Sequence, residues 1–290
     1  MPRVISNSEV TAYNECSRRH WYQYNNELQP RTYGLALTRG IVGHQILESY
    51  YLDILNGCSV DEAKKRTIGT LHNFIAKVAR DHPYDTDRLL MLSQLIPLIE
   101  RYIEYYRDEE FKVLHVEKTY IAKISEAYSY GMKLDLLVEM TRGPFKGEIV
   151  VWDHKFIYNF KSDEELSIDG QLPKYIKTVA AAEGLHITRG VFNQLRYREL
   201  KNTDPEMVFR RTWIKPSTEA KNQIWTEQIS ASEEIVHNPR PPRRTLSPLV
   251  CKNCYFLPIC RTELNGGDTK TMRHVDYMPL LDRYMDWSGD

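Results

Sequence analysis

The 290-residue sequence has no net charge, no long apolar stretch and only five cysteines. Basic and acidic residues number 39 each, so no global field attracts nucleic acid, and any such binding requires a local patch. No run approaches the roughly 18 apolar residues of a membrane helix, and the N-terminus lacks the apolar segment of a signal peptide. We therefore expect a cytoplasmic protein that does not bind membranes.

Internal repeats and low-complexity tracts are also absent, as is the Gly-x-x-x-x-Gly-Lys-Ser/Thr loop of helicases, which favours a stand-alone protein. Hydrophobic residues, at 42%, suffice for a core. Periodicity and capping signals predict a helical N-terminal part, followed by strands that alternate with helices. The predicted helices cover 6–25, 35–55, 59–80, 87–108, 170–183 and 217–237, and the predicted strands cover 112–124, 128–140, 148–156, 187–198 and 207–214.

This alternation predicts an α/β fold with a central mixed β-sheet flanked by helices. We expect a single domain over residues 1–262, in which residues 1–25 and 239–262 together form a cysteine-containing module. Residues 263–290 show no clear pattern and are expected to form a C-terminal tail.

Two predicted neighbouring strands carry carboxylates that could meet. Asp153 and Lys155 end one strand and share a face, because side chains two residues apart point the same way. Asp135 lies on the preceding strand, and a turn of only seven residues favours antiparallel pairing of the two. Carboxylates suit Mg²⁺ or Mn²⁺, and a lysine beside them can polarise a water or neutralise charge on a phosphate. Taken alone, the pair is more typical of an exposed ion pair on an edge strand than of a metal site.

Polar residues on two predicted helices could complete such a site. His44 follows a glycine-containing turn of helix, and Gln171 and Tyr175 are four residues apart on one helical face. Each is, by itself, typical of an ordinary polar helix face. Together with the carboxylates, His44 becomes a candidate metal ligand. Gln171 and Tyr175 become candidates for binding a phosphate or orienting Lys155.

The ordered set of four motifs resembles the PD-(D/E)xK nuclease superfamily, in its RecB-like branch. That branch carries, in this order, a helical Gly-x-x-x-His motif, a strand motif with Gly and Asp, an Asp-x-Lys strand motif and a Gln-x-x-x-Tyr helix motif. The matching segments here are Gly40-Ile-Val-Gly-His44, Gly131-Met-Lys-Leu-Asp135, Asp153-His-Lys155 and Gln171-Leu-Pro-Lys-Tyr175.

The resemblance implies a restriction-endonuclease-like core. It implies that His44, Asp135 and Asp153 bind the metal ion, helped by the backbone carbonyl of Phe156, and that Lys155 assists the attacking water. The expected function is a metal-dependent DNA nuclease, an exonuclease on single-stranded or end-containing DNA. It would act in recombination, repair or CRISPR adaptation, with other proteins of those systems as possible partners.

Four of the cysteines form a second pattern, Cys251-x-x-Cys254-x5-Cys260 with Cys16 far upstream. In a reducing compartment such clusters are metal ligands more often than disulfides. Four thiolates could bind a [4Fe–4S] cluster or a structural Zn²⁺, or bind no metal. The arrangement is similar to that of the iron–sulphur nucleases, among them CRISPR-associated adaptation exonucleases and AddB-type nuclease domains. This similarity implies a [4Fe–4S] cluster.

A local basic segment lies beside the cysteines. Arg240, Arg243 and Arg244 fall in a stretch without acidic residues, and Arg18 lies near Cys16. These arginines are candidate contacts to DNA phosphates. A solvated linker whose arginines aid solubility would have the same sequence pattern. Two other function classes stay open: a non-catalytic iron–sulphur DNA-binding scaffold, and a structure-specific or RNA-directed nuclease.

Overall fold

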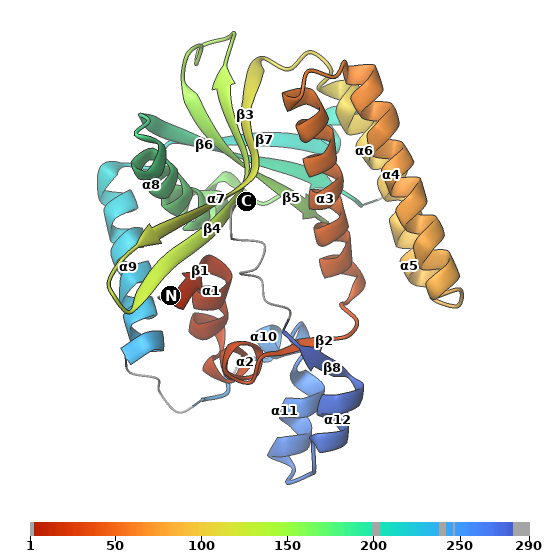
Figure 1. Ribbon diagram of the computed structural model, residues 1–290, viewed down its shortest axis with the longest axis vertical. Coiled ribbons are helices and arrows are strands. Elements are labelled where there is room, and N and C mark those ends of the chain that lie inside the picture. Colours follow the sequence, from red (N-terminus) through yellow and green to blue (C-terminus); the bar gives the residue numbers. More distant parts are fainter. Residues whose placement is uncertain (1–2, 199–203, 238–241, 246, 281–290) are drawn as a thin grey trace. The chain divides into compact units, whose positions relative to one another are not determined.

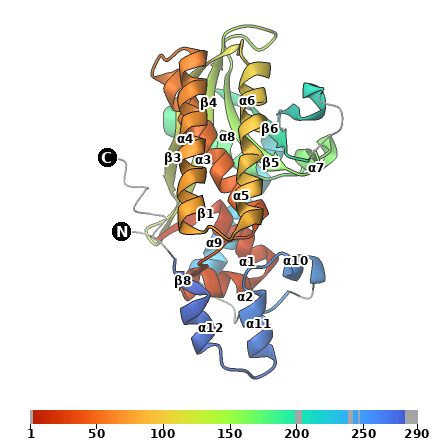
Figure 2. The ribbon, with the colours of Figure 1, turned by 90° about the vertical axis from the view of Figure 1, so that its right-hand side faces the viewer.

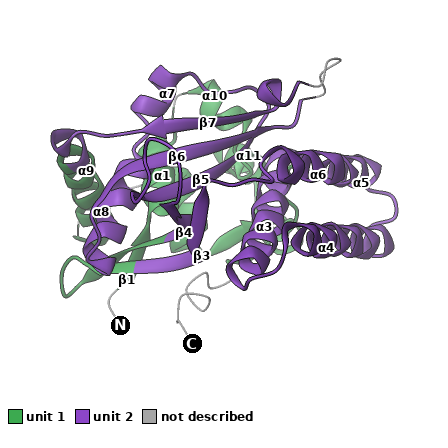
Figure 3. Ribbon diagram, turned by 90° about the horizontal axis from the view of Figure 1, so that it is seen from above, with its two compact units in different colours: residues 1–34, 121–132, 222–290 green, residues 35–120, 133–221 purple. Residues whose placement is uncertain are grey.

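The computed structural model describes residues 3–198, 204–237, 242–245 and 247–280. The chain divides into two compact units (Figure 3). The core unit comprises residues 35–120 and 133–221, and the terminal unit comprises residues 1–34, 121–132 and 222–290.

The core unit carries a helical segment, then a sheet with further helices. Its elements are α3 (Leu35–Leu55), α4 (Val60–Asp81), α5 (Thr86–Ser93), α6 (Leu95–Tyr105), β3 (Phe111–Lys123), β4 (Tyr128–Met140), β5 (Ile149–Ile157), α7 (Asp163–Ser167), α8 (Gln171–Glu183), β6 (Ile187–Arg196), the 3₁₀ turn η2 (Pro205–Met207) and β7 (Phe209–Ile214). The boundary between the units falls within β3 and β4.

The sheet of the core unit is mixed, which confirms the prediction. β3 pairs with β4, β4 is antiparallel to β5, β5 is parallel to β6, and β6 is antiparallel to β7. The parallel β5–β6 pair needs a crossover, which α7 and α8 supply. Successive side chains point to opposite faces, and the central strands β4 and β5 are buried on both, so helices must cover both sides of the sheet.

Helices lie on both faces of this sheet (Figure 1). On one face, Leu136, Val150 and Trp152 pack into a core with residues of α3, α4 and α6. On the other face α8 packs against β5 and β6. Gly190 allows this close approach, because a β-carbon there would lie 3.1 Å from side-chain atoms of Leu172.

The helical segment before the sheet follows its sequence signals closely, with one exception. α4 begins at a capping box in which Ser59 and Glu62 bond each other's backbone amides, and it lies beside α6 (Figure 2). The single helix predicted over 87–108 is wrong, because α5 ends at Ser93 and α6 begins at Leu95. Pro97 explains the break: it has no N–H to donate to the carbonyl of Ser93, and it is tolerated only in a first helical turn.

The terminal unit is built from the two ends of the chain. Its further elements are β1 (Arg3–Ser6), α1 (Asn7–Glu15), α2 (Ser17–His20), the π-helix η1 (Trp21–Asn25), β2 (Leu28–Pro30), α9 (Thr218–His237), α10 (Pro248–Lys252), α11 (Leu257–Leu264), α12 (Lys270–Val275) and β8 (Tyr277–Pro279). β1 is parallel to the first residues of β4, and β2 is antiparallel to β8. None of the described helices is long and apolar enough to cross a membrane.

The helix predicted over residues 6–25 is interrupted. Ser6 caps its start, as expected, but Cys16 has an extended backbone that separates α1 from α2. The segment expected to be a patternless tail contains α12 and β8 as far as residue 280. A three-residue strand such as β8 depends on its partner β2 and has no local sequence signal.

Candidate active site

Two buried carboxylates lie where β4 and β5 stop pairing. The backbone ladder runs from Glu139–Ile149 to Leu136–Trp152. One residue further on, the amide of His154 donates instead to Oδ2 of Asp135, at 2.6 Å. Asp135 and Asp153 are both buried. The antiparallel pairing predicted from the short turn is therefore present, and it brings the two strands' polar residues to one place.

Asp153, Lys155, Gln171 and Tyr175 form one hydrogen-bonded group. Lys155 Nζ lies 2.6 Å from Asp153 Oδ2 and donates to Gln171 Oε1 at 2.7 Å. The amide nitrogen of Gln171 donates to Asp153 Oδ1 at 2.7 Å and to the Tyr175 hydroxyl at 2.8 Å. Gln171 thus holds the aspartate and the lysine of the Asp-x-Lys motif in a fixed relation.

His44 reaches this group from α3. Its Nδ1 lies 3.3 Å from Asp135 Oδ2, and its ring packs against that of Phe156 with centroids 5.9 Å apart. The approach depends on Gly43, because a β-carbon there would lie 2.4 Å from the Phe156 ring. The structure therefore brings His44 to Asp135 and to the ring of Phe156. It also brings Asp153 to Lys155 and Gln171. Asp153 is not part of the described group of ligand atoms that converges within 4.8 Å.

Glu117 on β3 also belongs to the site, although the motifs do not include it. His44, Glu117 and Asp135 each offer one ligand atom, and these atoms all lie within 4.8 Å of one another. The backbone of Glu117 has φ +46°, a left-handed conformation that is uncommon for a non-glycine residue. Such strain costs about 1–3 kcal/mol and is typical of functional sites.

The register of the β3–β4 hairpin explains how Glu117 reaches the site. The amide of Ile124 donates to the carbonyl of Tyr128 and closes the β3–β4 hairpin. Seven residues separate Glu117 from Ile124, and seven separate Tyr128 from Asp135. Counting outwards from the turn therefore places Glu117 opposite Asp135.

The ionisation of these residues reflects crowded negative charge. Burial opposes the charged form of His44, but the Asp135 carboxylate, with Asp153 and Glu117, outweighs it and raises the pKa of the imidazole to about 9. Burial and the Asp135 carboxylate raise the pKa of Glu117 to about 7. Burial also raises the pKa of Asp153 to about 6, against the pull of Lys155. A divalent cation would displace these retained protons.

Asp135 and Lys155 stay ionised. Burial opposes the charge on Asp135, but His44 and the amide of His154 outweigh it and hold the pKa of this carboxyl well below its usual range. Burial likewise opposes the charge on Lys155, but Asp153 raises the pKa of the ammonium above its usual value. Lys155 is therefore a charged hydrogen-bond donor within this group.

His154, the middle residue of the Asp153-His-Lys155 motif, faces the opposite side of the sheet. The ring of His154 stacks on Tyr51, and burial lowers its pKa to about 3, so it is neutral. Its Nδ1 accepts from Asn193, which also donates to the hydroxyl of Tyr102. Because the His154 amide holds Asp135, this network positions the carboxylate. Sequence reasoning missed Asn193, which lies in a strand without any motif.

Replacing Glu117 by asparagine is expected to weaken Mn²⁺ binding by at least about tenfold without lowering the thermal midpoint. Asparagine tolerates a left-handed backbone better than glutamate, and the change removes a carboxylate that burial and Asp135 disfavour. Calorimetric titration with Mn²⁺ and a thermal melt measure the two effects. Glu126→Asn, at an exposed glutamate of the same hairpin, is the control. Unchanged Mn²⁺ affinity in Glu117→Asn would remove Glu117 from the ligand set.

The four cysteines of the second pattern all lie in the terminal unit. Among the described residues, however, they do not form a group of ligand atoms within 4.8 Å of one another, as His44, Glu117 and Asp135 do. All four cysteines are free and half-buried. The amide of Thr245 lies 3.4 Å from the sulfur of Cys16, and Nε of Arg244 lies 3.3 Å from that of Cys260. Cys254 and Cys260 pack beside a buried aromatic cluster that contains Phe256.

The candidate DNA-binding arginines have varied surroundings. Arg18 forms an ion pair with Glu263 and lies over the ring of Trp21, with its Cζ 4.8 Å from the centroid. Arg243 and Arg244 are exposed. Arg240 lies outside the described residues.

Comparison with known proteins gives one family match. Residues 4–261 match the model of the PD-(D/E)XK nuclease superfamily. No curated protein sequence matches the chain. Among solved structures, SSO0001 is similar at 12% identity, covering 90% of this chain and 87% of its own, with a TM-score of 0.42.

The alkaline exonuclease LHK-Exo from Laribacter hongkongensis is similar at 16% identity, covering 59% of this chain and 73% of its own, with a TM-score of 0.30. Its structure in complex with dAMP gives 15% identity, 59% and 72% coverage and a TM-score of 0.28. The family model spans nearly the whole chain and both strands that carry the paired carboxylates. The chain belongs to the PD-(D/E)XK nuclease superfamily.

Proposed function

We propose that the protein is a metal-dependent deoxyribonuclease that degrades DNA from ends or as single strands. The observation that carries the proposal is the convergence of His44, Glu117 and Asp135 within 4.8 Å, beside the Asp153–Lys155 pair. Two carboxylates and an imidazole are ligands that Mn²⁺ or Mg²⁺ accepts. Their crowded negative charge, with raised pKa values at His44 and Glu117, also fits a cation.

The ion would be held by His44, Asp135 and Glu117, with Asp153 and the carbonyl of Phe156 as further candidates. When bound, it would act as a Lewis acid on a phosphate oxygen. Lys155, kept charged by Asp153, donates hydrogen bonds to the attacking water or to charge that develops on the phosphate. Gln171 positions both groups, and Tyr175 in turn accepts a hydrogen bond from Gln171.

The choice between exonuclease and endonuclease can be tested with substrates that differ only in their ends. A linear single strand and a circular one of the same sequence are incubated with Mn²⁺. An exonuclease degrades the linear strand and spares the circle, whereas equal cleavage of both would contradict the proposal. Labels at the 5′ or 3′ end of the linear strand then give the polarity. Activity on ends would suit recombination, repair or CRISPR adaptation, with partner proteins of those systems.

We further propose that Cys16, Cys251, Cys254 and Cys260 bind a [4Fe–4S] cluster with a structural role. Support comes from four free, half-buried thiols and from N–H groups of Arg244 and Thr245 that lie near two of the sulfurs. Hydrogen bonds to sulfur and partial burial are typical of iron–sulphur sites. Free thiols also suit a cytoplasmic location, which we propose as well.

Anaerobically purified protein is expected to contain about four iron atoms per chain and to absorb broadly near 400 nm, as this cluster type does. Cys16→Ser should lose iron and lower the thermal midpoint, because the cluster joins segments far apart in the sequence. Cys58→Ser is the control, since Cys58 lies in the core unit. One zinc atom and no iron would contradict this proposal.

A further inference from the structure

An aromatic platform lies at the carboxyl ends of β5 and β6. It consists of Tyr158, Phe160 and Tyr197, which follow these two strands directly. The rings of Tyr158 and Tyr197 are 5.9 Å apart between centroids, and 54% of Tyr158 is exposed. The exposed ring of Tyr158 is therefore available for a ligand.

Four arginines surround the platform, each over one of its rings. The guanidinium of Arg39 lies 3.8 Å from the Tyr197 centroid and that of Arg198 lies 5.5 Å from the Tyr158 centroid. Those of Arg196 and Arg210 lie 5.5 Å and 4.5 Å from the Phe160 centroid. Tyr158 is exposed, whereas Phe160 and Tyr197 are half-buried. Positive charge beside such surface rings is the combination that binds single-stranded nucleic acid, through phosphates and stacked bases.

The platform is tied to the catalytic group by short connections. The amide of Lys161, next to Phe160, donates to the buried Gln194, and its Nζ lies 3.5 Å from Asp169 Oδ2. Asp169 also accepts from the amide of Gln171, which holds Lys155 and Asp153. Tyr158, directly after β5, is three residues beyond Lys155, at most about 10 Å along an extended chain.

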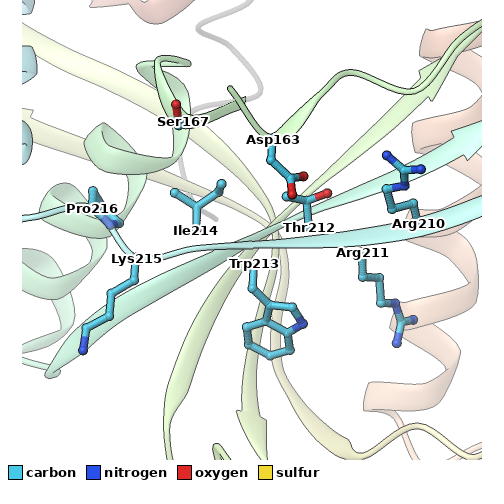
Figure 4. A pocket seen from close by; sticks show the side chains of 9 residues that line it. All are labelled: Asp163, Ser167, Arg210, Arg211, Thr212, Trp213, Ile214, Lys215 and Pro216. Carbon is cyan, nitrogen blue, oxygen red and sulfur yellow. The ribbon is translucent and has the colours of Figure 1, made fainter. Parts of the chain in front are cut away.

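A cleft lies along the edge strand β7 and adjoins the platform at Arg210. Its volume is about 740 Å³, and its lining includes Arg210, Thr212 and Lys215 (Figure 4). Figure 4 also shows that Arg210 extends to the opposite side of β7 from Arg211. Arg210 therefore borders both the cleft and the ring of Phe160.

We propose that this platform binds the single-stranded segment of the DNA substrate and leads it to the catalytic group. This inference rests on the proposed nuclease function and adds a substrate preference to it. Stacking on Tyr158 requires a base whose face is free, which paired bases within a duplex do not offer. The arginines would hold phosphates on either side of such a base.

The test is binding of a fluorescent 15-nucleotide oligothymidylate, measured by anisotropy in the Lys155→Met background with Mn²⁺. Tyr158→Ala should weaken binding about 5- to 100-fold. The double change Arg198→Ala and Arg210→Ala should reduce the salt slope by about 1.4, at roughly 0.7 for each phosphate contact. Tyr84→Ala, at a tyrosine 94% exposed, and Arg142→Ala, in the β4–β5 turn, are matched controls.

Thermal melts establish that each variant is folded. Affinity of Tyr158→Ala within twofold of the parent, or an equal loss for a duplex of the same length, would overturn the inference. Tighter binding of an oligouridylate would assign the platform to RNA instead of DNA. If the proposed nuclease function fails, wild-type protein does not cleave DNA. If only the platform fails, wild-type protein cleaves DNA and Tyr158→Ala binds the oligonucleotide as tightly as its parent.

Discussion

Replacing Lys155 by methionine is expected to slow phosphodiester cleavage by about 10²–10³-fold, the usual cost of losing one donor aimed at developing charge. Methionine keeps most of the side-chain volume but removes the ammonium that Asp153 holds in its charged form. Single-turnover cleavage of end-labelled DNA measures the rate. Mn²⁺ affinity should change by less than tenfold, because the nearest potential ligand set, His44, Glu117 and Asp135, is intact.

A matched control separates this effect from a general loss of positive charge. Lys112→Met removes an exposed lysine of β3 in the same unit and should cleave like wild type. The Lys155 variant should also melt at a lower temperature without metal, since Asp153 loses a buried partner at 2.6 Å. Cleavage at the wild-type rate by Lys155→Met would remove the lysine from the reaction.

Replacing Asp135 by asparagine is expected to lower Mn²⁺ affinity by more than about 100-fold and to abolish cleavage with it. Loss of a direct ligand should exceed the 10- to 100-fold cost of losing an outer-shell partner. The amide oxygen can still accept from the backbone of His154, so the strand pair should remain in place. Calorimetric titration with Mn²⁺ and a thermal melt distinguish loss of metal from loss of fold.

The control for this substitution is Asp81→Asn, at the exposed end of α4. It makes the same chemical change outside the site and should leave Mn²⁺ affinity and cleavage unaltered. If Asp135→Asn binds Mn²⁺ as tightly as wild type, the ion would have to be held elsewhere, and the assignment of His44 and Glu117 as co-ligands would fall too.

The parts of the site that the sequence predicts are those set by local periodicity. Asp153 and Lys155 share a face because they are two apart on a strand, and Gln171 and Tyr175 share a face because they are four apart on a helix. A seven-residue turn predicts that Asp135 lies on the neighbouring strand. These periodicities predict which side chains share a face. Gln171 on its helix and the Asp153–Lys155 face on its strand then meet through hydrogen bonds.

The parts that escape the sequence depend on register, strain or remote partners. Glu117 has a left-handed backbone within a strand, a conformation that residue propensities for strands do not predict. Asn193 matters only because His154 lies beside it across the β5–β6 pair. In the terminal unit, β2 and β8 define each other as strands although more than 240 residues separate them. Such pairs have no local signal.

Metal-dependent cleavage of DNA tests the central claim most directly. Wild-type protein and the Lys155→Met variant, purified in parallel, are incubated with 5′-labelled and 3′-labelled single-stranded DNA, in Mn²⁺ or in excess chelator. We expect cleavage by wild-type protein in Mn²⁺, none in chelator, and little by the variant although it binds the ion. Absence of Mn²⁺-dependent cleavage of any DNA by wild-type protein, or equal cleavage by the variant, would contradict the account and favour a non-catalytic, DNA-binding scaffold.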